Sequence, residues 1–137
     1  DNCLGLMNID QADADEDTFG DLCDCAPADP LFTDSLPMIQ GLVVEPGTPT
    51  EVLWDDLGES IDYEVAKGLI STLRTEGDIA SADCPAGGGT GSSWHDMGPE
   101  PEIGEVFYYV ARAVTGSCDG LFGTDSSGDR VVPASCM

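Results

Sequence analysis

The sequence predicts an all-β fold, in which a β-sandwich follows a short acidic segment with little core of its own. Three observations support this prediction. From about residue 36 onward, short apolar segments alternate with turns that contain Gly and Pro, which is typical of small antiparallel β domains. Residues 1–30 contain nine acidic side chains and neither Lys nor Arg. The 137 residues include six cysteines, an even number that suits a framework of disulfides.

The predicted strands follow one another through the second part of the chain. Residues 105–115 have the strongest strand pattern, because Phe107, Tyr109, Ala111 and Ala113 alternate onto one face. Short strands at this density, separated by turns, favour two packed sheets. The predicted strands are residues 39–44, 50–54, 61–70, 92–97, 105–115 and 130–135.

Two parts of this region are harder to assign. Residues 61–73 could also form an amphipathic helix, but Gly68 and the β-branched residues favour a strand there. Residues 77–91 and 116–128 are rich in Gly and Ser, and we expect both to be loops.

The acidic segment contains a regular motif. Residues 13–24 read DADEDTFGDLCD and place acidic side chains at positions 1, 3, 5, 9 and 12 of a loop. This is the ligand spacing of a calcium loop, in which position 7 contributes its backbone carbonyl. Calcium takes about six to eight oxygen ligands, and a cation makes so many neighbouring carboxylates tolerable. The spacing predicts calcium as a cofactor, bound by Asp13, Asp15, Asp17, the Phe19 carbonyl, Asp21 and Asp24.

Four short motifs extend this pattern over residues 1–25. They are Asp-Asn-Cys at 1–3, Asn-x-Asp-Gln at 8–11, Asp-x-Asp-x-Asp at 13–17 and Gly-Asp-x-Cys-Asp at 20–24. In this order they resemble a thrombospondin type 3 repeat. The resemblance implies calcium binding and a disulfide within the repeat, between Cys3 and Cys23.

The same resemblance has two further implications. Some repeats of this kind bind more than one ion, so Asn8 and Asp10 are candidate ligands of a second calcium. The family usually has glycine at the positions that Glu16 and Thr18 occupy here. A residue other than glycine at such a sharp turn costs on the order of 1 kcal/mol.

A second resemblance covers residues 36–136. It is carried by Val52-Leu-Trp54, Tyr63-x-Val65, residues 107–113 and residues 123–130. These segments are similar to the fibronectin type III-like domains of secreted bacterial proteins, which implies a β-sandwich with Trp54 in its core. In one register Phe107 takes the place of a corner tyrosine, so that hydroxyl hydrogen bond would be absent. The predicted division of the chain is a repeat at 1–27, a linker at 28–35 and the sandwich at 36–137.

The cysteines point to an oxidising compartment. One His and the absence of paired Cys-x-x-Cys motifs disfavour zinc. Beyond the pairing that the resemblance implies, two sets stay open. The first is Cys84–Cys118, with Cys25 and Cys136 bridging neighbouring subunits head to tail. The second is Cys25–Cys84 with Cys118–Cys136.

Charge restricts the partners of this protein. The formal net charge is −23, with 27 acidic residues and only 4 Lys and Arg, which disfavours binding to nucleic acid or to an anionic membrane. No apolar run is long enough to span a bilayer. Such a surface suits metal ions, and a homo-oligomer or homopolymer of it needs cations to neutralise the repulsion between subunits.

The sequence contains no convincing catalytic motif, so we expect no enzyme. Ser93, His95 and Asp96 are near neighbours in the chain, whereas the members of a triad converge from separate elements. Trp94 is a candidate contact for a surface protein or a glycan. Two functions stay open for an extracellular or cell-surface protein of this kind, namely a calcium-binding structural subunit of a filament and an adhesion or binding module of a larger secreted bacterial protein.

Overall fold

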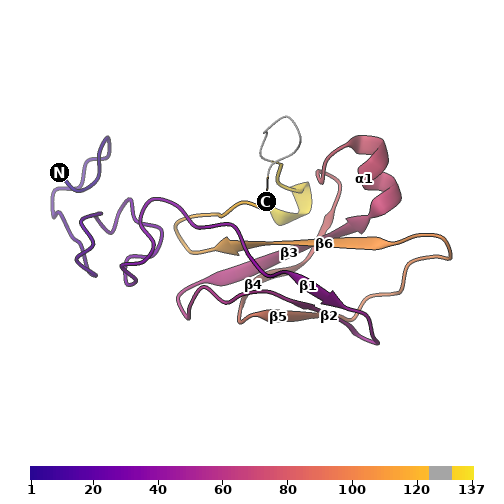
Figure 1. Cartoon of the computed structure of the whole chain (residues 1–137). Coiled ribbons are helices and arrows are strands. Elements are labelled where there is room, and N and C mark those ends of the chain that lie inside the picture. Colours follow the sequence, from indigo (N-terminus) through magenta and orange to yellow (C-terminus); the bar gives the residue numbers. More distant parts are fainter. Residues whose placement is uncertain (124–130) are drawn as a thin grey trace.

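The computed structural model describes residues 1–123 and 131–137, and for residues 86–90 it describes only the backbone. Most of its regular structure lies in two three-stranded antiparallel sheets (Figure 1). The first sheet has the order β1 (Val43–Glu45), β2 (Thr50–Leu53), β5 (Ser93–Asp96). The second has the order β4 (Asp83–Thr90), β3 (Asp62–Leu69), β6 (Phe107–Val114), and it is followed by the short 3-10 helix η1 (Ala134–Cys136).

One apolar core joins the two sheets. Val52 of β2 packs with Val65 of β3 and Ala111 of β6, and the Trp54 and Tyr63 rings lie 5.3 Å apart within the same cluster. The core also receives residues that precede the first strand, including part of the predicted linker: Cys25, Ala26, Phe32 and Leu36. The chain therefore folds its N-terminal part against the same core that holds the sheets together.

Tyr63 holds a corner of this core through its hydroxyl group. The hydroxyl donates a hydrogen bond to Asp56 Oδ1 at 2.8 Å and accepts one from the Leu57 backbone N–H at 2.6 Å. Burial raises the pKa of Tyr63 to about 12. The hydroxyl that makes these hydrogen bonds thus belongs to Tyr63 on β3, whereas Phe107 has no hydroxyl group.

Several predicted elements differ from the observed ones. Residues 61–73 are a strand followed directly by the helix α1 (Ile70–Glu76), which ends at Gly77 with a left-handed φ of 82°. The regular structure of the described residues is therefore mostly β, with one α-helix. The predicted strand at 39–44 begins only at Val43, because Gly41 has a φ of 64° that interrupts extended backbone.

A predicted loop and a predicted strand also need correction. The Gly-rich segment within 77–91 contains β4, whose backbone pairs with β3 through an irregular register. The predicted strand at 130–135 is wrong for residues 131–135, where η1 begins, and Arg130 lies outside the described residues. Pro133 has no N–H to donate to a strand, which is the physical reason. Of the predicted loop at 116–128, residues 124–128 lie outside the described range.

All six cysteines form disulfides within the chain. Cys3 is bonded to Cys23, as the resemblance implied. Both sets that were left open for the other four cysteines are wrong, because the remaining pairs are Cys25–Cys118 and Cys84–Cys136.

The path of the chain explains these two pairs. The turn after β6 brings Cys118 back beside the end of that strand, where the Thr115 N–H donates to the Cys118 carbonyl at 2.8 Å. Cys25 lies beside this turn as well, since the Thr115 hydroxyl donates a hydrogen bond to the Cys25 carbonyl at 2.5 Å. Cys136 is carried by η1 to the start of β4. These pairings leave no cysteine for a bond between subunits.

Candidate metal centre

The acidic loop at residues 13–24 folds tightly around its own carboxylates. Glu16 has a φ of 62° and Thr18 a φ of 87°, so both adopt the left-handed backbone that favours glycine. These are the two positions at which the resemblance implied glycine. The loop therefore has the sharp turns expected of a metal loop, although its residues there are not glycine.

Three aspartates of the loop share one bonding pattern. Asp13 accepts a hydrogen bond from the Thr18 N–H at 3.1 Å through Oδ2, and Asp17 accepts one from the Phe19 N–H at 2.8 Å through Oδ1. Asp15 accepts the Asp17 N–H at 3.3 Å through Oδ1. Each carboxylate is thus fixed by one oxygen atom, which leaves the other oxygen free to point elsewhere.

The second oxygens of these carboxylates are buried together. Asp13 Oδ1, Asp15 Oδ2 and Asp17 Oδ2 have no hydrogen-bond partner within the described part of the chain. One ligand atom from each of the three residues lies within 4.8 Å of the others. Buried carboxylate oxygens without partners are costly unless a cation compensates them.

Asp24, the last residue of the motif, repeats the pattern in the most buried position. Its side chain is 1 % exposed, and Oδ1 accepts the Ala26 N–H at 2.9 Å. Its other oxygen is buried and has no partner among the residues that the structure describes. Burial raises the pKa of Asp24 despite the Ala26 N–H, and the negative charges of Asp17, Asp15 and Asp21 act in the same direction.

Asp13, Asp15 and Asp17, whose ligand atoms lie within 4.8 Å of one another, offer the type of donor atom that a hard cation such as calcium accepts. Oxygen ligands from a flexible loop are the donor set that calcium prefers, and a bound dication would offset the repulsion that now acts on Asp24. Asp21 belongs to the loop as well, since its Oδ1 accepts the Ala14 N–H at 2.8 Å. The Phe19 carbonyl stays a predicted ligand.

The candidate second ion has less support. The Asn8 side-chain amide donates to Asn2 Oδ1, and its carbonyl oxygen accepts from Gln11 Nε2 at 2.6 Å. Asn8 is thus already engaged, while the Asp10 side chain is exposed. Their role as ligands stays a prediction.

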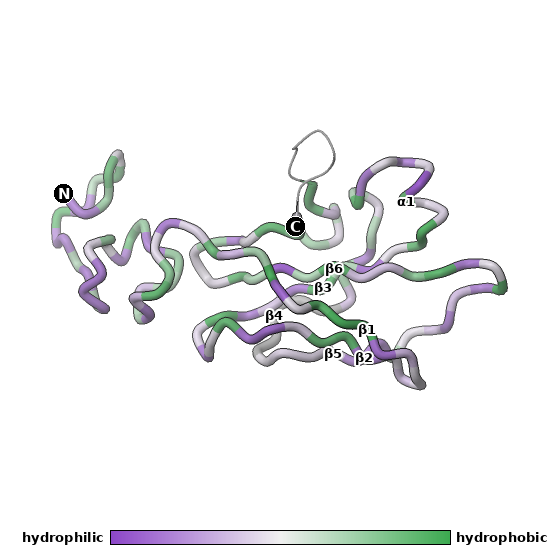
Figure 2. The backbone as a smooth tube through the Cα atoms, in the orientation of Figure 1, coloured by the Kyte–Doolittle hydropathy of each residue, from purple (hydrophilic) through white to green (hydrophobic). Residues whose placement is uncertain are grey.

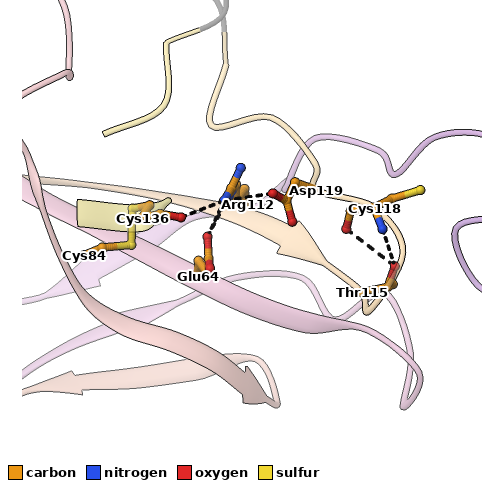
Figure 3. Close-up of polar contacts among 7 residues, drawn as sticks. All are labelled: Glu64, Cys84, Arg112, Thr115, Cys118, Asp119 and Cys136. Carbon is orange, nitrogen blue, oxygen red and sulfur yellow. Dashed lines mark hydrogen bonds and ion pairs between the residues drawn. A yellow bond between two sulfur atoms is a disulfide. The ribbon is translucent and has the colours of Figure 1, made fainter. Parts of the chain in front are cut away.

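A second group with metal-ligating atoms lies outside the acidic loop, on β3, β4 and η1. Glu64, Cys84 and Cys136 have ligand atoms within 4.8 Å of one another, but both cysteines are consumed by their disulfide. Figure 3 shows that Glu64 instead faces Arg112. This group is therefore structural in the oxidised protein.

Arg112 is the buried cation that the sequence did not reveal. Its side chain is 3 % exposed and lies 2.7 Å from Glu64 Oε2, 3.5 Å from Asp119 and 3.3 Å from the Cys136 carbonyl (Figure 3). It connects β6 with β3 and the C-terminal segment. A signal was available in hindsight, because one of only four cations lies within the apolar strand 105–115.

We predict that Arg112→Met destabilises the fold by roughly 3 kcal/mol, because the substitution leaves the half-buried Glu64 carboxylate unpaired. Chemical denaturation measures the difference. The double variant Arg112→Met/Glu64→Gln should recover part of the loss. The exposed Arg74→Met is the matched control, with an expected change within about 0.5 kcal/mol. Equal losses in Arg112→Met and Arg74→Met would contradict the role of this cluster.

A second ion pair joins the two sheets. Lys67 Nζ of β3 lies 2.6 Å from Asp96 Oδ2 of β5, and the Tyr109 hydroxyl donates to the same oxygen at 2.7 Å. Burial opposes ionisation of Asp96, but the hydrogen bonds from Lys67, Tyr109 and Gly98 outweigh it and lower its pKa.

His95 points away from this pair, toward Glu51 at 3.5 Å. His95 and Asp96 thus contact different partners. Trp94, the predicted surface contact, is half-buried, and its ring lies 6.4 Å from that of Tyr109.

Of the described helices, neither has the length and the apolar composition that crossing a lipid bilayer requires. The chain matches no protein-family model, and it has no significant similarity to a curated protein or to a solved structure.

Proposed function

We propose that this protein is a secreted, calcium-binding structural protein that forms a subunit of an extracellular assembly. The observation that carries the proposal is the set of four carboxylates, Asp13, Asp15, Asp17 and Asp24, each of which keeps one buried oxygen without a hydrogen-bond partner in the described chain. A bound calcium ion would use these oxygens and neutralise part of the acidic N-terminal unit. The strained backbone at Glu16 and Thr18 supports the same reading.

Three disulfides in 137 residues support a location outside the cytosol, since thiols stay reduced in most cytosolic proteins. The two sheets over one core are also what a fibronectin type III-like sandwich requires, and the loop and its Cys3–Cys23 bond suit a thrombospondin type 3 repeat. Both assignments are part of the proposal.

In the proposed function, copies of the protein associate with one another. Subunits of charge −23 repel one another at close range, and salt alone screens neighbouring charges only partly. Bound calcium removes charge where two acidic surfaces meet. Bound calcium would neutralise the acidic loop in the same way in a module of a larger secreted protein. Such a module needs the metal for rigidity but does not polymerise.

We expect the purified protein to form assemblies in millimolar calcium and to lose them in excess chelator. Light scattering and electron microscopy with calcium, with magnesium and with chelator measure this. Because the three disulfides lie within the chain, detergent alone should release monomer without a reductant. A monodisperse monomer at high concentration in calcium would overturn the structural role and favour the binding module.

A further inference from the structure

Of the 4 Lys and Arg residues in the chain, Lys67 is the only lysine. Its side chain is only 12 % exposed, and Nζ lies 2.6 Å from Oδ2 of Asp96, whose side chain is 8 % exposed. Arginine is the better residue for a buried ion pair, and the chain uses it in the pair of Arg112 with Glu64. The one primary amine on a side chain of this protein is therefore held against a buried carboxylate.

The pair lies between the two sheets. Lys67 belongs to β3 in the second sheet, and Asp96 belongs to β5 in the first. Figure 2 shows β5 as a separate tube below β3 and β6, in the orientation of Figure 1. None of the three disulfides joins a strand of one sheet to a strand of the other. A covalent bond within this pair would thus add a link between the sheets that the disulfides do not supply.

Both oxygens of the Asp96 carboxylate are held by hydrogen-bond donors. The Tyr109 hydroxyl donates to Oδ2 at 2.7 Å, and the Gly98 N–H donates to Oδ1 at 2.9 Å. Burial raises the pKa of Tyr109, so its hydroxyl keeps its proton. The Lys67 ammonium also packs against Phe107, with Nζ 3.8 Å from the centre of the ring. The amine and the carboxyl group are thus fixed in contact, with a donor on each oxygen, as amide formation requires.

We propose that Lys67 Nζ and Asp96 Cγ become joined by an amide bond in the folded protein. A proton first passes from Nζ to Oδ2, which converts the ion pair into an amine and a carboxylic acid. The amine then attacks Cγ, and the Gly98 N–H stabilises the negative charge that develops on Oδ1. After a second proton has passed from Nζ to Oδ2, that oxygen leaves as water, while the Tyr109 hydroxyl donates a hydrogen bond to it.

The atoms of this step balance without another reactant. One carbon–nitrogen bond forms and one carbon–oxygen bond breaks, and both hydrogens of the released water come from the ammonium group. No oxidant or reductant is needed. The water has a way out, because Lys67 and Asp96 line an open groove of about 600 Å³.

Two physical effects favour the bond. A buried ion pair bears the desolvation cost of two charges, and a neutral amide removes both charges from the interior. Groups that the fold holds in contact also react with effective concentrations of about 10⁵–10⁸ M, which offsets the hydrolysis of an amide by water. The inference concerns the two sheets and does not depend on calcium binding by the acidic loop.

Mass spectrometry of the wild type, fully reduced and denatured, tests the proposal. The chain should be lighter than its sequence requires by one water molecule, and a reagent for primary amines should label only the α-amine. A peptide map should join the segment that contains Lys67 to the segment that contains Asp96. Lys67→Arg keeps the positive charge but has no amine that can form the bond, so it should have the full mass of its own sequence. A wild type of full mass with a reactive Lys67 amine would overturn the proposal.

Tyr109→Phe tests the role of the hydroxyl group on the leaving oxygen. The matched control is Tyr108→Phe, which removes a hydroxyl that lies against Gly68 instead. The fraction of chains that have lost water is measured at a fixed time after synthesis, before the wild type is complete. Loss of a proton donor slows such a step by about 100-fold, so this fraction should fall in Tyr109→Phe and stay unchanged in Tyr108→Phe. Equal fractions in the two variants would contradict the role given to Tyr109.

Discussion

Replacing Asp17 with Asn should remove most of the calcium-dependent stability of the protein. Asp17→Asn keeps an oxygen that can accept the Phe19 N–H, yet it withdraws a full negative charge from the cluster formed by Asp13, Asp15 and Asp17. A ligand at about 100 times its Kd stabilises the folded state by about 2.7 kcal/mol, and the variant should show little of this gain. Thermal unfolding with and without calcium measures the difference.

The matched control is Glu16→Gln, which removes the same charge from the same loop. The Glu16 side chain is exposed and does not belong to the cluster, so calcium should stabilise this variant nearly as much as the wild type. Equal responses to calcium in Asp17→Asn and in the wild type would remove this loop from the metal site.

Removing the Cys25–Cys118 disulfide should produce the largest loss of stability. The bond closes a loop of 93 residues, and the chain-entropy relation gives about 4.5 kcal/mol for a loop of that length. The disulfide also holds the acidic loop near the end of β6, because Asp24 of the loop directly precedes Cys25. A hydrogen bond from the Thr115 hydroxyl to the Cys25 carbonyl lies at the same junction. Cys25→Ser/Cys118→Ser should therefore unfold at a much lower denaturant concentration.

Two comparisons check that result. Removal of the Cys3–Cys23 bond, which closes only 20 residues, should cost less, about 3 kcal/mol by the same relation. Peptide mapping without reduction should join Cys25 to Cys118. A fragment that joins Cys25 to Cys84 or to Cys136, or a loss below about 1 kcal/mol, would contradict the pairing.

Much of the sheet structure could be predicted because it depends on local alternation. Residues 105–115 and 50–54 contain apolar side chains at alternate positions, and β6 and β2 lie there. β4 was missed because glycines 87–89 have no side chains to alternate, although their backbone can still pair with β3. α1 was missed because it follows β3 without a break, from Leu69 to Ile70.

The disulfide pairs and the buried ion pairs depend on the path of the whole chain. Nothing local to Cys25 indicates that the turn after β6 returns Cys118 to it. Arg112 is likewise an ordinary surface-type residue until its strand is placed between Glu64 and the C-terminal segment. The proximity of Asp13, Asp15 and Asp17 could be predicted because they lie within five residues of one loop, whereas the binding of a metal there stays a prediction.

Isothermal titration calorimetry of calcium into the metal-free wild type asks directly whether the acidic loop binds a metal ion. We predict saturable binding of at least one ion per chain, lost in Asp17→Asn and retained in Glu16→Gln. Magnesium should bind more weakly, because its small octahedral shell suits a cluster of loop carboxylates poorly. The absence of calcium binding by the disulfide-intact wild type at millimolar concentration would show that the acidic loop is not a calcium site.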